Sequence, residues 1–463
     1  MGLTARAGVA AGHPTTAQTG ADVLNRGGNA VDAAVAMMLV SCAAETIFTG
    51  LGGGGFATVY DAVTGQVRCV DFFVSVPGLS GKQPGPGTEI EVIFVGQRMP
   101  YEIGAGTVAV PGIPAGASHL WRHWGRLPWA DVVEPGLRAS YGTPFPEMHA
   151  RLLPRVAAAM VVGDGEEVYR RPDGDYLQPG DALRHTDHHA AYELLMQDPD
   201  AFYRGAYADA LVKSVAEGGA LTSEDLQAYQ VIETTPRSVK VDGFTVHARG
   251  DDLDGVLPTM ASAARRMPRD PRTDPASALG LVQALRAPDR RAETTNIVAV
   301  DRQGDGCVIT TSLGLGSGVW VEGYGVHLNS MIGEGELVRE LVQPGQRMGS
   351  MMSPLVALNG RGELVVAAGA AGGSRIRPAL VQCVLRMLRG EDPQHAIDAP
   401  RLNALPDLVR LEPGFSPQVI AALEEAGPVA VADHRDHYFG GVSAVSHLGG
   451  GADPRRSGFV VLV

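Results

Sequence analysis

The fold prediction for this chain begins from the segment Glu293-Thr294-Thr295-Asn296-Ile297-Val298-Ala299-Val300-Asp301. Its apolar part leads into a glycine-containing turn at residues 302–306, and a second apolar stretch, residues 307–312, follows at once. This pattern predicts a β-hairpin that begins at a pair of threonines. Because β-branched residues suit the start of any strand, the pair alone also allows a purely structural interpretation.

A threonine in this position can also serve a special chemistry. If the chain is cut before Thr294, the side-chain hydroxyl becomes a nucleophile, and the freed α-amino group of the same residue becomes its base. The pKa of an α-amino group is ordinarily about 7.7–8.0, which suits a base near neutral pH. The hairpin therefore contains a candidate nucleophile that needs no separate histidine.

Composition limits the kinds of partner. The chain has 463 residues, of which 45% are hydrophobic and 19% charged, so it can bury a sizeable core. A formal net charge of −13 argues against nucleic acid and anionic membranes as partners. The longest apolar run, residues 33–44, is too short to span a bilayer, and no secretory signal is visible at residues 1–20, so we expect a cytoplasmic protein.

The four cysteines are far apart and show no metal-ligand spacing. We therefore expect reduced thiols, no metal and no cofactor. The glycine run at residues 50–55 precedes a strand and lacks the Gly-Lys-Ser/Thr of a phosphate loop, so close backbone packing against a buried helix is favoured over nucleotide binding.

The remaining pattern predicts strands and helices in alternating groups. Residues 30–40 form an apolar helix that should be buried, residues 147–235 are mainly helical, and residues 239–247 read as one strand. Residues 249–293 are charged and proline-rich, which predicts a linker with one helix at residues 276–285. Two further strands precede Gly372-Gly373, which open another helix. Strands between buried helices favour a mixed α/β (α+β) fold, a four-layer αββα sandwich.

Several short motifs together resemble the γ-glutamyltranspeptidase family of the N-terminal-nucleophile hydrolases. They occur in the family's order over nearly the whole chain: His13-Pro14, residues 27–34, residues 50–56, Leu127-Pro128-Trp129, Phe202-Tyr203, residues 222–229, Thr294-Thr295, Ser353-Pro354 and residues 372–376. Any one piece is unspecific, but this many in register are strong evidence of the resemblance.

The resemblance implies autocleavage between Glu293 and Thr294. The products would be a heavy chain, residues 1–293, and a light chain, residues 294–463, which together form one αββα domain and which could pair into a dimer of such units. Thr294 would be the nucleophile, and Gly372 and Gly373 would donate backbone N–H groups to the oxyanion, as suits two glycines that open a helix. Ser312 takes the place of a family threonine that contacts the nucleophile, with Thr310 and Thr311 as alternatives if the register differs by one.

The positions that bind substrate depart from the family. Members that bind γ-glutamyl groups hold the α-carboxylate with an arginine, where this chain has Phe73. Without it, a buried carboxylate loses a charge-assisted pair worth roughly 1.5–3 kcal/mol. The other departures are Ser350-Met351 for two serines, Gly314 for asparagine, Met331 for glutamine and Asn296 for histidine. They predict an apolar pocket that accepts aromatic groups, unless Arg375 or Arg377 takes over the carboxylate.

Three functional hypotheses follow for a small-molecule substrate. The first is hydrolysis of an amide or acyl compound other than a γ-glutamyl one, in secondary metabolism, with true γ-glutamyl transfer or hydrolysis as its alternative. The second is hydrolytic cleavage of a carbon–carbon bond in a tyrosine-derived intermediate of an antibiotic pathway, as the resemblance to some relatives implies. The third is a scaffold without turnover, which an uncut chain would favour.

Overall fold

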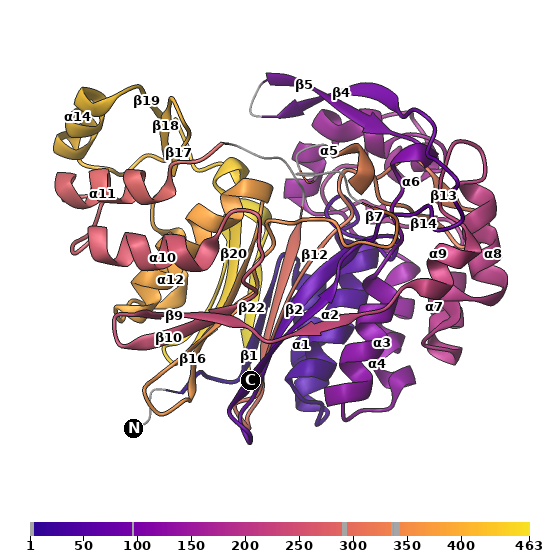
Figure 1. The fold of residues 1–463 in the computed structure, drawn as a ribbon, viewed down its shortest axis with the longest axis horizontal. Coiled ribbons are helices and arrows are strands. Elements are labelled where there is room, and N and C mark those ends of the chain that lie inside the picture. Colours follow the sequence, from indigo (N-terminus) through magenta and orange to yellow (C-terminus); the bar gives the residue numbers. More distant parts are fainter. Residues whose placement is uncertain (1–3, 95–96, 289–293, 335–336, 338–342) are drawn as a thin grey trace.

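The computed structural model describes residues 4–94, 97–288, 294–334, 337 and 343–463. Two antiparallel sheets face each other in its centre, and helices cover the outer face of each (Figure 1). The predicted four-layer αββα sandwich is therefore confirmed.

Each sheet combines strands from distant parts of the chain. The seven-stranded sheet has the order β22 (Phe459–Leu462), β1 (Gly8–Ala11), β11 (Thr295–Val300), β12 (Gly306–Ser312), β2 (Gly54–Asp61), β3 (Gln66–Phe72) and β8 (Ile232–Thr234). The six-stranded sheet has the order β21 (Gly449–Ala452), β20 (Gly441–Ser446), β16 (Leu364–Ala371), β15 (Leu355–Leu358), β10 (Phe244–Ala248) and β9 (Arg237–Val241). The predicted hairpin is confirmed as β11 and β12, which pair from Thr295 opposite Thr311 to Val300 opposite Gly306.

Small β-branched and aliphatic residues fill the space between the sheets. Val298 and Val308 of the first sheet pack there with Val356 and Val445 of the second. Helix α2 (Ala30–Ala44) lies behind the first sheet with all 15 residues buried, which confirms the predicted buried helix and extends it by four residues. Its first turn is held by Asp301 at the end of β11, whose Oδ2 accepts a hydrogen bond of 3.0 Å from the Ala30 N–H.

The glycine run brings backbone close to backbone, but its partners differ from the predicted helix. A Cβ atom added at Gly54 would lie 2.7 Å from the Val74 nitrogen, and one at Gly53 would overlap the Ser312 carbonyl oxygen. The run therefore lets β2 approach β12 and the segment after β3. These are the segments that lead to the candidate site.

Residues 249–288 are not a linker. They form helices α10 (Val256–Arg266) and α11 (Pro275–Leu285), which pack against each other and, through α10, against α12 (Ile376–Leu388). Residues 239–247 likewise belong to two strands, because Asp242 and Gly243, with φ of 49° and 89°, make the tight turn between β9 and β10.

The other elements complete the outer layers and the small sheets outside the sandwich. The helices are α1 (Pro14–Asn25), α3 (Ile113–Trp124), α4 (Trp129–Ser140), α5 (Glu147–Met160), α6 (Gly165–Tyr169), α7 (His188–Gln197), α8 (Gly205–Ser214), α9 (Ser223–Ala228), α13 (Pro393–Asp398) and α14 (Pro417–Ala426). The small sheets pair β4 (Thr88–Phe94) with β5 (Gln97–Ile103), β13 (Trp320–Val321) with β14 (Val326–His327), and β17 (Leu402–Ala404) with β18 (Val409–Leu411) and β19 (Val429–Val431). β6 (Thr143–Pro144) pairs with β7 (Ala182–Leu183).

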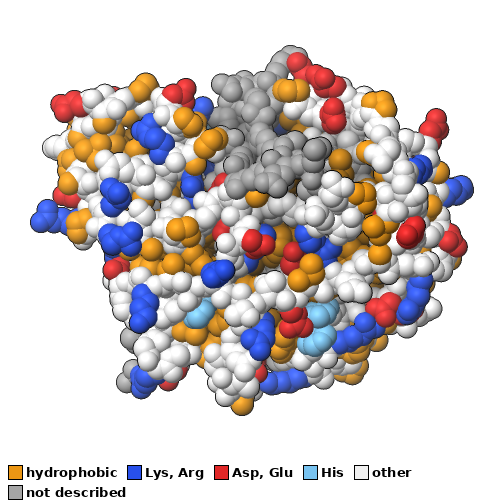
Figure 2. All heavy atoms as spheres, in the orientation of Figure 1, with side chains coloured by type: hydrophobic (Ala, Val, Ile, Leu, Met, Phe, Trp, Pro, Cys, Tyr) orange, Lys and Arg blue, Asp and Glu red, His pale blue; other side chains and the backbone are white. Residues whose placement is uncertain are grey.

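The surface mixes charges of both signs. Lys and Arg side chains and Asp and Glu side chains are both scattered over the face shown in Figure 2. Within the described residues, no helix combines the length and apolar character needed to cross a membrane.

Candidate active site

Thr294 lies directly before β11, between the two sheets' ends, and is 1% exposed. Within the described part of the chain its Oγ1 has no hydrogen-bond partner. A buried hydroxyl without a partner costs roughly 1–3 kcal/mol, so such groups are rare and call for an explanation. Glu293, on the other side of the expected cut, lies outside the described residues.

Thr294 borders a cavity with about 230 Å³ of empty space, which we call the apolar cavity. Its walls come from the end of β12 in the first sheet, from the start of α12 with the turn before it, and from the loops around them. The lining residues are Phe73, Thr294, Ser312, Met331, Leu337, Ser350, Met351, Met352, Gly373 and Ile376. The structure thus brings together seven of the residues proposed from sequence and places hydrophobic side chains around the threonine.

Phe73 is held firmly in the wall of this cavity. Its ring stacks on Phe56 of β2 with centroids 5.3 Å apart, and the guanidinium of Arg249 lies 3.6 Å from the centroid of the Phe56 ring. The backbone N–H of Phe73 donates to Asp71 Oδ1 at 2.8 Å, and the backbone carbonyl of Phe73 accepts from the Tyr229 hydroxyl at 2.8 Å. Packing and backbone hydrogen bonds therefore fix the Phe73 side chain in the cavity wall.

The glycine pair connects the second sheet to α12. Gly372 and Gly373 have φ of 125° and 60°, a region that side chains disfavour, and residues Gly373–Arg375 form a short 3-10 turn that runs into α12. Gly373 lines the apolar cavity, and Gly372 is the residue before it. This places the positive end of α12 and its entry turn beside Thr294.

The remaining sequence-predicted residues lie around the cavity in different ways. The Ser312 Oγ, on the cavity wall, accepts a hydrogen bond of 3.0 Å from the Gly314 N–H, and Gly314 itself is not among the described lining residues. Asn296 accepts from Thr310 at 2.8 Å, and Thr311 accepts from Thr49 at 2.9 Å. Ser312 is thus the hydroxyl of the second hairpin strand that reaches the cavity.

A second cavity lies on the other side of Thr294, with about 290 Å³ of empty space. We call it the Glu45 cavity. Its described lining residues are Gly12, Glu45, Phe48, Thr294, Thr295, Asn296, Ala371, Gly441, Val442, Ser443, Asp453, Arg456 and Gly458. Asn296 therefore lies near Thr294, but it lines this cavity instead of the apolar one.

Glu45 is a functional candidate that the sequence reasoning missed. Its carboxylate, fully buried just after α2, accepts hydrogen bonds from Thr16 Oγ1 at 2.8 Å and from the hydroxyl of Thr295, the neighbour of Thr294. Burial raises the pKa of Glu45 from 4.5 to about 7, although the two hydroxyl donors oppose this. Such a carboxyl can exchange a proton near neutral pH beside the candidate nucleophile.

Neither alternative arginine is among the described residues that line the apolar cavity. Arg377 donates to the backbone carbonyls of Leu285 at 2.7 Å and Asp254 at 3.3 Å, which ties α12 to the α10–α11 region. Arg375 is 1% exposed, and its guanidinium lies 5.6 Å from the Tyr438 ring centroid. The apolar cavity therefore combines the Thr294 hydroxyl with mainly apolar walls and has neither arginine among its described lining residues.

The chain matches known proteins over almost its whole length. The family pattern described as Gamma-glutamyltranspeptidase matches residues 16–261 and 254–463. The glutathione hydrolase proenzyme of Bacillus subtilis (strain 168) is 26% identical over 95% of this chain and 90% of its own length. The acylase ACY 1 proenzyme of Pseudomonas sp. (strain V22) is 26% identical over 95% of this chain and 89% of its own. The crystal structure of cephalosporin acylase from Bacillus halodurans, 22% identical, matches the fold with a TM-score of 0.79 over 99% of this chain and 96% of that chain.

Proposed function

Because this chain belongs to the gamma-glutamyltranspeptidase family, we propose that it is a self-processing hydrolase of acyl compounds with Thr294 as its N-terminal nucleophile. The observation that supports this most is the buried Thr294 hydroxyl, which has no partner among the described residues and faces the apolar cavity. The names of two relatives, both called proenzymes, agree with a precursor that is cut.

The proposed reaction has two halves. Once the bond before Thr294 is cut, the α-amine takes the proton of Oγ1 while Oγ1 attacks the substrate carbonyl. The N–H groups of Gly372 and Gly373 stabilise the negative oxygen, and the loss of one such donor ordinarily lowers the rate about 10²–10³-fold. The leaving amine takes the proton from the α-amine, and an acyl ester on Thr294 remains. Water then attacks this ester, its proton returns through the α-amine to Oγ1, and the carboxylic acid is released.

The apolar cavity favours a substrate whose acyl part is hydrophobic. Phe73, Met331 and Met351 replace groups that would bind a glutamyl amine and carboxylate, and a buried carboxylate without a partner is strongly disfavoured. We therefore propose an acylase-type activity on an amide with an aromatic or aliphatic acyl group. Secondary metabolism fits such a substrate, and the two processed chains would remain together as one catalytic unit.

Intact-mass measurement of the purified protein tests the proposed cut. We expect two chains, one ending at Glu293 and one beginning at Thr294, and a single uncut chain for Thr294→Ala. Thr294→Ser is the matched control, since it keeps a hydroxyl and should still be cut. A wild-type chain that stays continuous through residue 294, or active protein from Thr294→Ala, would refute the assignment and favour a scaffold.

Paired chromogenic anilides test the substrate class. Phenylacetyl-p-nitroanilide should be hydrolysed at a higher kcat/KM than γ-glutamyl-p-nitroanilide, with p-nitroaniline released in step with the acid. The reverse preference would reject the apolar-acyl proposal but leave the nucleophile intact. Release of a carboxylic acid without an amine, from a substrate that carries a cleavable carbon–carbon bond, would instead support the second hypothesis.

A further inference from the structure

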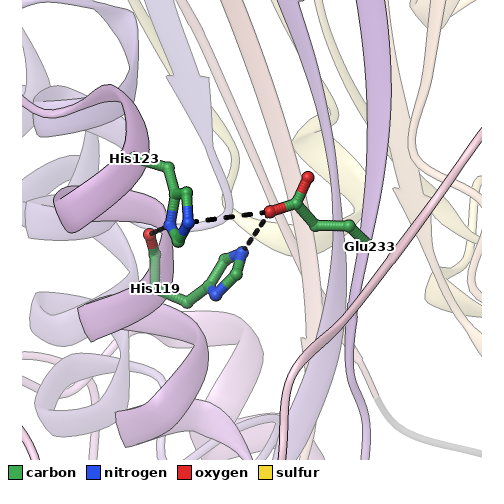
Figure 3. Close-up of side chains that lie close together, drawn as sticks. All are labelled: His119, His123 and Glu233. Carbon is green, nitrogen blue, oxygen red and sulfur yellow. Dashed lines mark hydrogen bonds and ion pairs between the residues drawn. The ribbon is translucent and has the colours of Figure 1, made fainter.

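Three side chains that can bind a metal ion meet on the outside of the first sheet. His119 and His123 come from successive turns of α3, and Glu233 comes from β8 (Figure 3). One ligand atom from each lies within 4.8 Å of the others. None of the three is among the described lining residues of the apolar cavity or the Glu45 cavity.

The carboxylate of Glu233 faces both imidazoles. Its Oε1 lies 2.9 Å from His119 Nε2 and 3.9 Å from His123 Nε2. The two rings stack with centroids 4.0 Å apart. Ligand atoms on a tetrahedral zinc ion, each about 2.0–2.2 Å from it, stand roughly 3.4 Å apart, so small side-chain rotations bring these three atoms to that spacing.

The hydrogen bonds fix which nitrogen of His123 is free. Its Nδ1 lies 2.8 Å from the backbone oxygen of His119, and a carbonyl oxygen can only accept, so Nδ1 carries the proton. In the neutral ring, Nε2 then presents a lone pair toward the Glu233 carboxylate, an arrangement that repels unless a proton or a metal cation lies between them. A metal-binding histidine typically donates its other N–H to a backbone carbonyl in this way.

We propose that His119, His123 and Glu233 bind one divalent transition-metal ion of the zinc class. Two neutral imidazoles and one carboxylate are a common protein set for zinc, and the partial exposure of the three side chains, 19%, 49% and 35%, leaves a further position for water. The metal replaces the proton that His119 Nε2 shares with Glu233, while His123 keeps its bond to the backbone.

The ion would join an edge strand to a helix. β8 pairs only with β3 in the described sheet and ends it, and its three residues are exposed. The ligands come from α3 and β8, so they are brought together only in the folded protein. An ion that binds the folded state and not the unfolded chain would raise the melting temperature.

Calorimetric titration of Zn²⁺ into the untagged, chelator-treated full chain tests the proposal. We expect one equivalent to bind, with at least a tenfold loss of affinity in each of His119→Asn, His123→Asn and Glu233→Gln. His395→Asn is the matched control: His395 is exposed and lies 3.4 Å from the Asp392 carboxylate, yet within the described residues it belongs to no such group of three ligands. Its affinity should equal that of the parent.

Fluorescence gives an independent readout. The Trp124 indole lies 5.5 Å from the His123 ring and 6.2 Å from the His119 ring, centroid to centroid, so paramagnetic Co²⁺ in the site should quench it. Zn²⁺ should reverse the quenching, and Trp124→Phe should remove it. Equal zinc affinity in the parent and Glu233→Gln would overturn the proposal and leave an ordinary hydrogen-bonded cluster. The absence of saturable binding of one equivalent with a Kd below about 1 mM would overturn it as well. Melting temperatures without metal check that the variants are folded.

Discussion

Replacing Glu45 with glutamine should remove a pH dependence of stability that the buried carboxyl imposes. Burial raises the pKa of Glu45 from 4.5 to about 7, and the donors Thr16 and Thr295 offset only part of that cost. A carboxyl with a raised pKa binds more protons in the folded state than in the unfolded state between these two values. The free energy of unfolding therefore falls as pH rises through this window, and it levels off above about pH 7.

The size of the effect follows from the pKa difference. Each pKa unit corresponds to about 1.4 kcal/mol, so the ionised carboxyl destabilises the fold by about 3 kcal/mol above pH 7 relative to its protonated form. About 2 kcal/mol of this destabilisation develops as the pH rises from about 5.5 to 8. The glutamine variant keeps an acceptor oxygen for one of the two hydroxyls, and its NH2 group can donate to the oxygen of the other. It does not titrate, so it should lack this pH dependence.

Urea unfolding at about pH 5.5, 6.5 and 8 measures the effect. Both proteins should also contain Thr294→Ala, so that each is one continuous chain and scission does not enter the comparison. As the pH rises across this range, the protein with Glu45 should lose about 2 kcal/mol of unfolding free energy relative to the Glu45→Gln variant. Other titrating groups are common to both proteins and cancel in this comparison.

A shift below about 0.5 kcal/mol would show that Glu45 titrates near its ordinary pKa. A shift of the opposite sign would show that the carboxylate is stabilised, for example by Arg456, which lines the same cavity. Either result would refute the assignment of Glu45 as a group that changes charge near neutral pH.

Three other substitutions test the packing around the site. Gly369→Ala places a Cβ atom in overlap with the Asn296 Oδ1, so it should lower the free energy of unfolding by roughly 1–3 kcal/mol or more in urea, whereas Gly360→Ala, with nothing within 4 Å, should not change it. Asp453→Ala takes the carboxylate partner from buried Arg401 and one of the two carboxylates from buried Arg455, which keeps Glu412, and should cost about 3–5 kcal/mol in the same assay. Phe73→Ala should cost about 3–5 kcal/mol of stability and raise KM for aromatic acyl substrates more than it lowers kcat, as steady-state kinetics would show.

The sequence predicted the sandwich and the central hairpin because periodicity and turn residues determine them locally. The apolar helix before the glycine run and the threonine pair before an apolar strand are clear patterns in a single stretch of chain. By contrast, the linker prediction for residues 249–293 was wrong for the described part, residues 249–288, although the helix predicted within it at residues 276–285 is confirmed as α11. The error has a positional reason. Pro258 lies in the first turn of α10 and Pro275 at the first position of α11, where a missing N–H costs no helical hydrogen bond.

Other features were missed because their partners are distant in sequence. Glu45 is a polar residue after a helix, and only the fold brings it to Thr295, 250 positions later. His119 and His123 lie four positions apart on α3, a spacing that puts both side chains on one face of the helix, but two histidines alone do not identify a site. Nothing local connects either histidine to Glu233. The turn at Asp242-Gly243 is different, since that dipeptide is a strong hairpin signal that the sequence reasoning should have used.

The strand order has a consequence for the mature protein. β1, from the segment before Thr294, lies between β22 and β11, both from the segment after it, and in the second sheet β15 joins the later segment to β10 of the earlier one. A cut before Thr294 would therefore yield two polypeptides that are interlaced across both sheets. They could separate only by unravelling, so halves expressed from separate genes would have to fold around each other to give an enzyme.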